Sequence, residues 1–315
     1  MASSNAAFRL SDPQTWPGWV GIALVILSTI ILGSSPTWAR IAFEAGANAE
    51  AAGFARFAFG AAVTLPILLA LPNRAVWLTP RVLVPSLGIG ALYAGQSTTY
   101  LIALDLLPVA IAVVALFTFP LFVALISRFT DRVPIGAPKA VGIGLAFIGV
   151  VLVTQAAPMA VNPAGLGFAL IAAIGTALYL VVGGRVSRTV GSLAFSALSF
   201  LGAAAVMGGW IGVTGGAEWP QTWVGWGAFC LLTGTFIGGI LLFLTALMCM
   251  ETVHATLFAN LEPLVAIGFA FLVLGEPIGG LQAVGAALVI FAVAGPTVLD
   301  ARSEQRRSAE NTHRK

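Results

Sequence analysis

Four polar or aromatic side chains recur at helical spacing within an otherwise apolar segment, at Tyr93, Gln96, Ser97 and Tyr100. The spacing i, i+3, i+4, i+7 places all four on one face of a helix. Gln and Ser donate and accept hydrogen bonds, and the tyrosines add rings with polar tips. This face suits a zwitterionic or aromatic metabolite if it lines a cavity, and it joins helices if it packs against a neighbour.

A second polar row lies near the C-terminus, where Thr256 and Asn260 are one helical turn apart and Glu262 lies on an adjoining face. An isolated carboxylate at mid-membrane costs ~2.5 to 3.5 kcal/mol on insertion scales, so Glu262 should be protonated, paired or facing water. It is either a proton-coupling or amine-binding group, or a buried partner of Arg56 or of backbone groups freed by Pro263.

Arg56 is the basic residue that we expect well within the hydrocarbon, towards the outer side. Its guanidinium either holds a substrate carboxylate with two hydrogen bonds or serves as a structural partner of backbone carbonyls, Glu44 or Glu50. Trp38 and Tyr179 are weaker candidates for the same site. Trp38 lies near a predicted helix end and is expected in an interfacial aromatic belt.

The composition is that of an integral membrane protein, with 59% hydrophobic and 9% charged residues and a mean hydropathy of +0.99. The net charge of +3 comes mostly from predicted helix ends and the C-terminal tail, so it indicates no nucleic-acid partner. Cys230 and Cys249 fall in one predicted helix, too far apart to meet. We therefore expect no disulfide, no metal and no cofactor.

The sequence lacks the motifs of an intramembrane or nucleotide-driven enzyme. There is no His-Glu-x-x-His metal motif and no phosphate-binding loop ending in Gly-Lys-Ser/Thr. Asp105 and Asp131 are expected at opposite helix ends, which argues against an aspartyl dyad. We therefore predict that the chain is not an enzyme and carries no catalytic residue.

Ten segments are long and apolar enough to span a bilayer, which takes roughly 20 residues each. They are residues 18–39, 49–71, 83–104, 107–128, 136–155, 163–185, 190–213, 222–248, 253–274 and 278–298. Residues 1–17 are expected to form a cytoplasmic N-terminal segment and residues 299–315 a disordered cytoplasmic tail. The predicted fold class is thus an all-α membrane protein with ten transmembrane helices.

The distribution of basic residues predicts the orientation, because Lys and Arg accumulate in cytoplasmic loops. With the N-terminus inside, only Arg40 and Arg56 fall towards the outside, and both termini are cytoplasmic. The compact loops suit a bacterial inner membrane. The basic residues on the cytoplasmic side are Arg9, Arg74, Arg81, Arg128, Arg132, Lys139, Arg185, Arg188 and those of the tail.

The chain contains an internal repeat. Pro120 is followed by Pro134-Ile135-Gly136 with the spacing that separates Pro263 from Pro277-Ile278-Gly279, an offset of 143 residues from Pro120 to Pro263. The two copies, residues 18–155 and 163–298, hold five predicted helices each, and an odd number makes the repeat inverted. Pro120 and Pro263 each interrupt a spanning helix, either as hinges or as static kinks.

These motifs resemble those of the drug/metabolite transporter superfamily, specifically the ten-helix EamA-type permeases. Gly33-Ser34-Ser35 is similar to the family's Trp-Gly-Ser element, with Leu32 in place of Trp. Arg56 is similar to the family's arginine in the second helix. Tyr100 to Leu104 with Pro120, and Phe243 to Leu247 with Glu262-Pro263 and Gly275-Glu276, resemble the paired motifs of the two repeats.

The resemblance implies a secondary transporter with a central chamber, commonly an exporter of amino acids or related small metabolites. We expect alternating access, with substrate contacts from Tyr93, Gln96, Ser97, Tyr100, Thr256 and Asn260, and Glu262 and Arg56 setting the charge. The partners would be a small-molecule substrate, the bilayer and, as a candidate, protons, while the oligomeric state stays open, with a monomer as one option. Alternatives are export of drug-like compounds, amines or nucleobases, or a receptor or scaffold that transports nothing.

Overall fold

The computed structural model describes residues 18–70, 77, 79–130, 137–155, 161–249, 258, 261–292 and 295. Thr256 and Asn260 lie outside these residues, as do the predicted N-terminal segment and C-terminal tail. The described chain is helical and contains no strand, so the all-α class is confirmed.

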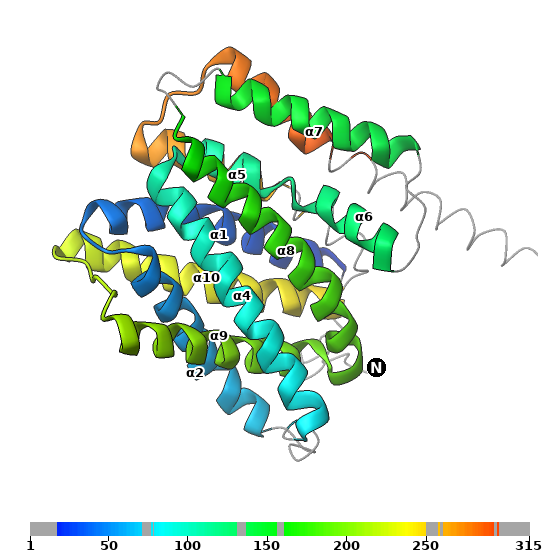
Figure 1. The fold of residues 1–315 in the computed structure, drawn as a ribbon, viewed down its shortest axis with the longest axis vertical. Helices are drawn as coiled ribbons and strands as arrows, with labels where there is room; N and C mark the ends of the chain where they lie inside the picture. The colour runs from blue at the N-terminus through cyan, green and yellow to red at the C-terminus, as the bar shows by residue number, and fades with distance from the viewer. Residues whose placement is uncertain are drawn as a thin grey trace, which may run out of the picture.

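Long helices form most of the structure (Figure 1). Within the described residues, six apolar helical segments are long enough to cross a membrane, and one of them, Val109–Thr130, comprises two of the helices named next. The helices are α1 (Gly18–Glu44), α2 (Ala49–Ala70), α4 (Pro80–Leu106), α5 (Val109–Leu116), α6 (Phe119–Thr130), α7 (Ala137–Gln155), α8 (Pro163–Val190), α9 (Ser192–Thr214), α10 (Trp223–Cys249), α12 (Glu262–Phe269), the π-helical turn η2 (Ala270–Leu274) and a last helix over Gly280–Ala292.

Helix α4 has 27 residues, enough to span a bilayer, but it is not among the six candidate spans. It carries the predicted polar face, from Tyr93 to Tyr100, and polar side chains lower its hydropathy. A helix that is long enough yet this polar must turn its polar face towards protein or water.

The predicted span 107–128 is divided in the structure. Helix α5 ends at Leu116 and α6 begins at Phe119, with a turn at Phe117 and Thr118 between them. Hydropathy alone could not reveal this break, because both halves are apolar and together they read as one span.

The break changes the interpretation of the two prolines. Pro120 is the second residue of α6, and Pro263 is the second residue of α12, which follows a turn at Leu261. A proline in the first turn of a helix costs little, because the N–H that it lacks would have no partner there. Each helix is therefore interrupted just before its proline, and whether this point moves stays a prediction.

The helix boundaries repeat at the offset between Pro120 and Pro263. Helices α2, α4, α6 and α7 begin at residues 49, 80, 119 and 137; their counterparts begin at 192, 223, 262 and 280. The second set lies 143 residues after the first at every position. The chain is thus two copies of one helical unit in three dimensions as well as in sequence.

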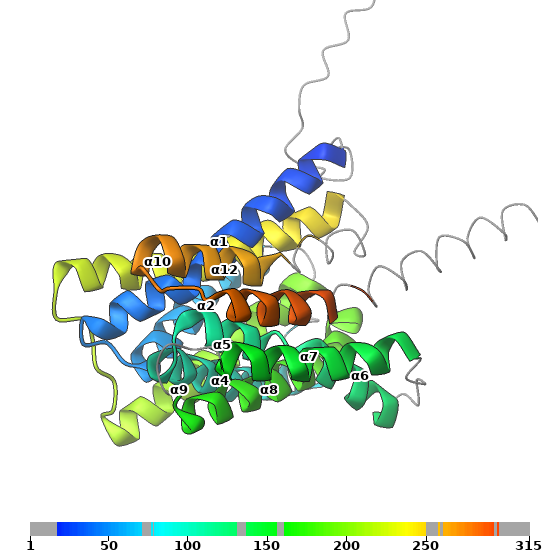
Figure 2. The ribbon, with the colours of Figure 1, turned by 90° about the horizontal axis from the view of Figure 1, so that it is seen from above.

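The contacts between the halves follow the same repeat. Helix α1 packs along α10, and α4 packs along α8. The offset of 143 residues relates α1 to α8 and α4 to α10, so the two pairs are equivalent contacts in the two copies. Figures 1 and 2 show both pairs side by side. Single residues follow the same equivalence, because the offset relates Leu32 to Gly175 and Gln96 to Gly239. A Cβ on Gly175 would lie 2.9 Å from Gln96, and a Cβ on Gly239 would lie 2.5 Å from Leu32. The repeat therefore relates the two packing faces.

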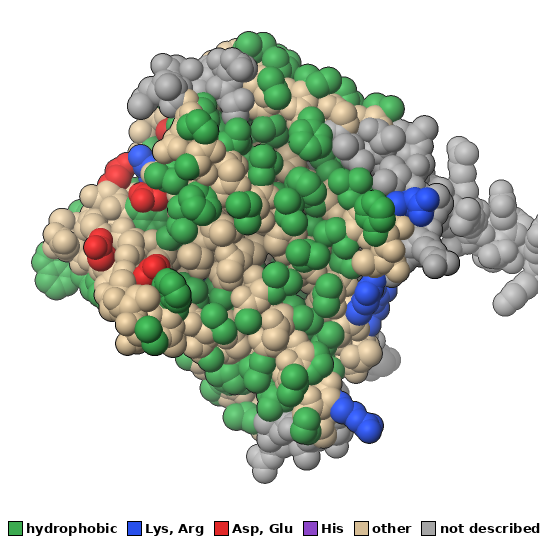
Figure 3. Space-filling model, in the orientation of Figure 1, with side chains coloured by type: hydrophobic (Ala, Val, Ile, Leu, Met, Phe, Trp, Pro, Cys, Tyr) green, Lys and Arg blue, Asp and Glu red, His purple; other side chains and the backbone are tan. Residues whose placement is uncertain are grey.

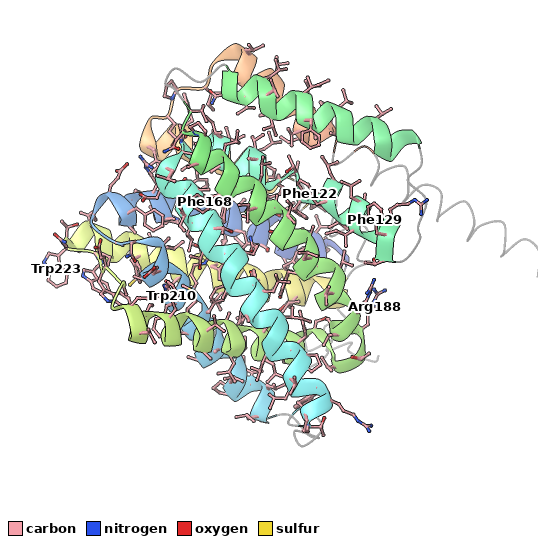
Figure 4. All side chains as sticks on the ribbon, in the orientation of Figure 1. Phe122, Phe129, Phe168, Arg188, Trp210 and Trp223 are labelled. Carbon is pink, nitrogen blue, oxygen red and sulfur yellow. The ribbon has the colours of Figure 1, made fainter. Side chains whose placement is uncertain are left out.

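Charged side chains gather at opposite ends of the molecule. In the described chain, Glu44, Glu50, Asp105, Glu218 and Glu276 lie at the end where α1, α4 and α9 finish, whereas Arg81, Arg128, Arg185 and Arg188 lie at the other. In Figure 3 the red side chains gather at the left, where one blue side chain lies among them, and the other blue side chains lie at the right. Trp210 and Trp223 project at the acidic end, and Arg188 lies at the basic end (Figure 4). This separation is typical of an acidic end outside and a basic end in the cytoplasm, although the topology itself stays a prediction.

We predict that Gly90→Ala lowers stability by about 1–3 kcal/mol, because the added Cβ would overlap the Ser199 backbone oxygen where α4 crosses α9. Gly88→Ala is the matched control, since no atom lies within 4 Å of its added Cβ and alanine favours a helix. The midpoint of thermal unfolding in detergent measures both. Equal midpoints for the two variants would contradict the close crossing.

Candidate functional site

Four aromatic rings meet where the two halves come together. They are Phe57 of α2, Tyr93 of α4, Phe200 of α9 and Phe236 of α10, and each ring contacts the other three with centroids 5.0–6.4 Å apart. The repeat offset pairs Phe57 with Phe200 and Tyr93 with Phe236. Equivalent residues that contact one another must lie close to the axis that relates the repeats. We call these four residues the aromatic tetrad.

The polar groups around the tetrad do not follow the repeat. The residue before Phe57 is Arg56, whereas the residue before Phe200 is Ser199. The Tyr93 ring stacks on Tyr179 of α8, with centroids 4.3 Å apart. Sequence ranked Tyr179 as a weak candidate, but the structure brings it into direct contact with the predicted face. The tetrad itself is symmetric, but the polar residues next to it differ between the two copies.

Arg56 is 7% exposed, and its guanidinium carbon lies 3.8 Å from the centroid of the Phe236 ring. Such a cation–π contact contributes about 2 kcal/mol when it is shielded from water. The buried Nε of Arg56 has no hydrogen-bond partner, and no ion pair involves Arg56 within the described chain.

The two carboxylates considered as partners of Arg56 are engaged elsewhere. Glu44 accepts a hydrogen bond from Arg40 Nε at 3.1 Å, and Glu50 accepts one from Trp210 Nε1 at 3.0 Å. The interpretation of Arg56 as a structural partner of Glu44 or Glu50 is therefore wrong. Its charge is stabilised by an aromatic ring instead, and its hydrogen-bonding capacity is not used up by either acid.

The side chains on the predicted face of α4 contact different neighbours. Tyr93 belongs to the tetrad, and Tyr100 packs against the main hydrophobic core. Ser97 is 2% exposed, and its Oγ is buried without a hydrogen-bond partner. Gln96 packs its Cβ against Gly175 of α8. The face is thus turned inward, and it combines helix packing at Gln96 with an unsatisfied hydroxyl at Ser97.

Glu262 is the first residue of α12 and is half-buried. It interacts electrostatically with Tyr93 and Tyr100, and Arg56 interacts with the same two tyrosines. A carboxylate in the first turn also complements the positive end of the helix dipole. The carboxylate makes no ion pair with Arg56, so the two opposite charges act on the same tyrosines without neutralising each other directly.

The first turn of α12 can approach the site because α1 offers a glycine there. A Cβ on Gly33 would lie 2.8 Å from Val265 and 3.0 Å from the backbone oxygen of Glu262. Gly33 belongs to the Gly-Ser-Ser element noted in the sequence, and the structure explains the glycine as a packing requirement. The element positions the half-helix that carries Glu262.

Trp38 differs from its predicted place. Its Nε1 donates a hydrogen bond to Ser34 Oγ at 3.2 Å, and its half-buried ring packs against the main core. Exposed tryptophans instead gather near the α9–α10 connection, where Trp219 and Trp226 stack with centroids 6.2 Å apart. These exposed tryptophans are the ones that an interfacial belt would use, whereas Trp38 supports α1 from inside.

A model of the EamA-like transporter family matches the chain twice, over residues 19–155 and 163–296. The chain belongs to the EamA-like transporter family. This confirms the resemblance drawn from the motifs, and it makes the protein a multi-pass membrane transporter of small molecules. A crystal structure of a protein aligns with this EamA-like chain at 22% identity and a TM-score of 0.61, covering 89% of this chain and 98% of the other. That likeness shows a shared fold. No curated protein matches the chain.

Three members of the tetrad in this EamA-like transporter were missed in the sequence, namely Phe57, Phe200 and Phe236. Phenylalanines are common in spanning helices, so burial and hydropathy do not distinguish them. A signal was nevertheless present: the repeat offset aligns Phe57 with Phe200 and Tyr93 with Phe236. Aromatic residues kept at equivalent positions of both copies can meet at the symmetry axis.

We predict that Phe200→Ala lowers the free energy of unfolding by about 3–5 kcal/mol, because it removes a ring that is 2% exposed and contacts all other members of the tetrad. Phe129→Ala is the control, since Phe129 is 82% exposed near the end of α6 (Figure 4). Denaturant titration in detergent compares the two. A cost for Phe200→Ala no greater than for Phe129→Ala would remove the tetrad from the core.

Proposed function

We propose that this EamA-like protein exports amino acids or closely related zwitterions by alternating access. The observation that carries the proposal is the placement of two opposite charges that form no ion pair within the described residues. Arg56 and Glu262 both interact with Tyr93 and Tyr100, yet they form no ion pair with each other. An α-amino acid carries a carboxylate and an ammonium group that complement this pair.

The surroundings of the two charges support the same substrate class. Buried charges are costly unless they are paired, and a zwitterion would supply a partner to each. Guanidinium groups bind carboxylates with two parallel hydrogen bonds, and Ser97 adds a buried hydroxyl on the same face of α4. The tetrad and Tyr179 offer ring surface for an apolar or aromatic side chain.

Gln96, Thr256 and Asn260 complete the proposed chamber. The polar end of Gln96 makes no side-chain hydrogen bond with the described residues, although its Cβ packs on Gly175. The sequence places Asn260 two residues before Glu262, and Thr256 one turn earlier. Amide and hydroxyl groups there would orient the substrate once the charges hold it.

The mechanism we propose uses the two copies of the unit. The halves would rock about the tetrad, because contacts on the symmetry axis are common to both arrangements of an inverted repeat. The breaks before Pro120 and Pro263 lie at equivalent places in the two copies. They would let α6 and α12 bend against the rest of their halves.

We predict that Arg56→Gln raises the KM for an exported amino acid roughly tenfold to a hundredfold, because a charged hydrogen-bond partner of its carboxylate is lost. Growth rescue against toxic amino acids, amines and nucleobases identifies the substrate, and flux into proteoliposomes then measures KM. The corresponding decarboxylated amine should be much less affected by the substitution.

Arg188→Gln is the control, because Arg188 is exposed at the basic end and donates from Nε to Gly184 of its own helix. An amine or a nucleobase as the substrate, with KM unchanged in Arg56→Gln, would favour the alternative of a drug-like or amine exporter. No flux of any compound that rescues growth would instead indicate a receptor or scaffold.

We further propose that Glu262 couples transport to protons. In Glu262→Gln the side chain keeps its shape but cannot exchange a proton, so substrate should still equilibrate but no longer accumulate in response to a pH difference. Proteoliposomes with and without an imposed pH gradient measure this. Gradient-driven accumulation by Glu262→Gln equal to that of the wild type would rule out the coupling role.

A further inference from the structure

The connection between α4 and α5, residues 104–110, is bound at both of its helix ends by charged side chains from elsewhere in the chain. Glu276 lies in the connection after η2, in the second copy of the unit. Its two carboxylate oxygens accept hydrogen bonds from Val109 N at 2.8 Å and Ala110 N at 3.3 Å. These are the first two N–H groups of α5, whose own N-cap, Pro108, provides no side-chain cap.

Arg40 binds the other side of the same connection. Its Nη1 donates to the backbone oxygens of Leu104 at 3.2 Å and Asp105 at 2.8 Å, in the last turn of α4. Glu44 accepts a hydrogen bond from Arg40 Nε and so holds the guanidinium in place. Helix carbonyls at a C-terminus lack intrahelical partners, and a cation is favoured there.

The charges match the helix dipoles at each end. A carboxylate at the start of α5 and a guanidinium at the end of α4 both meet helix-end groups of opposite partial charge. Packing also holds the connection in place, because Leu107 is 1% exposed and lies against α8. A Cβ on Gly165 of α8 would lie 2.8 Å from Leu107. Backbone, charge and packing therefore hold one position of the connection.

Other hydrogen bonds close the same acidic end across the two copies. Asn48 N donates to Glu218 O at 3.1 Å, and Gln221 N donates to Ala45 O at 2.8 Å. Asn48 Nδ2 donates to Gly216 O at 2.6 Å. The segment between α1 and α2 is thus tied to the segment between α9 and α10. These contacts join the two copies at the acidic end in this structure.

The repeat shows that the charged contacts are not required by the fold. The residue equivalent to Arg40 in the second copy is Gly183, and the residue equivalent to Glu276 in the first copy is Val133. Neither can provide a charged hydrogen bond to the corresponding connection at the basic end. In an inverted repeat, the two ends exchange roles when the transporter changes state. Two charged residues that occur in one copy only would favour the state in which they bind the connection.

We propose that Glu276 and Arg40 form a latch that holds the acidic end shut, so that the resting transporter opens at the basic end. The proposal rests on alternating access in the proposed function, and it adds which gate is locked and by which groups. Opening at the acidic end requires Glu276 to leave the start of α5 and Arg40 to leave the end of α4.

Spin labels on either side of the latch test it. The labels are attached to cysteines that replace Asp105 and Gly280 in a protein without Cys230 and Cys249. Asp105 is exposed in the connection, and a Cβ added to Gly280 meets no atom within 4 Å. Electron–electron distance measurements in proteoliposomes then compare variants. Glu276→Ala should raise the ratio of long to short distances roughly tenfold or more, because two hydrogen bonds to a charged group are lost, and Glu276→Gln should give a smaller rise.

Glu218→Ala is the matched control: it removes an acid from the same end, where only the Glu218 backbone oxygen takes part in the closing contacts. Arg40→Met is a second variant that unlocks the connection without touching Glu276. Longer distances in either latch variant, with the control unchanged, support the latch. Wild-type distributions in both latch variants would overturn it. The measurement needs no substrate, so its outcome is independent of the flux assay that tests the proposed function.

Discussion

The contact among Phe57, Tyr93, Phe200 and Phe236 is the constraint on which the rest of the structure depends. Aromatic rings bury large apolar areas and prefer defined edge-to-face or offset geometries, so four rings in mutual contact fix α2, α4, α9 and α10 relative to one another. Because equivalent residues of the two copies meet there, the contact would persist if the halves exchanged roles in the proposed alternating access. It would then be the one place that need not move.

The proposed substrate site lies where the two copies differ around this shared frame. Arg56 and Glu262 have Ser199 and Phe119 as their counterparts, so each charge occurs once. A chamber built from two identical halves would present the same groups twice. Such a chamber would suit a symmetric ligand and would match a zwitterion poorly. One cation and one anion beside Tyr93 and Tyr100 instead define a direction in which an amino acid would lie.

The ends of the molecule differ for a similar reason. Glu276 and Arg40 bind backbone groups at two helix termini, where unsatisfied N–H and C=O groups would otherwise need water. Their counterparts, Val133 and Gly183, cannot do so. In the proposed mechanism, symmetric packing would allow two states with exchanged ends, and a few unsymmetric charged contacts would decide which state is the more stable.

The sequence by itself determined the all-α membrane class, the family, the two copies and their offset, because spanning length, hydropathy and repeated proline motifs are local properties of the chain. It also singled out Tyr93, Ser97, Arg56 and Glu262, since polar groups are costly in an apolar segment. Only the tertiary structure decided their partners: Arg56 stacks on Phe236 rather than pairing with Glu50. It also decided where α5 breaks from α6 and which rings meet. Contacts between residues distant in sequence depend on how helices cross, and hydropathy does not encode that crossing.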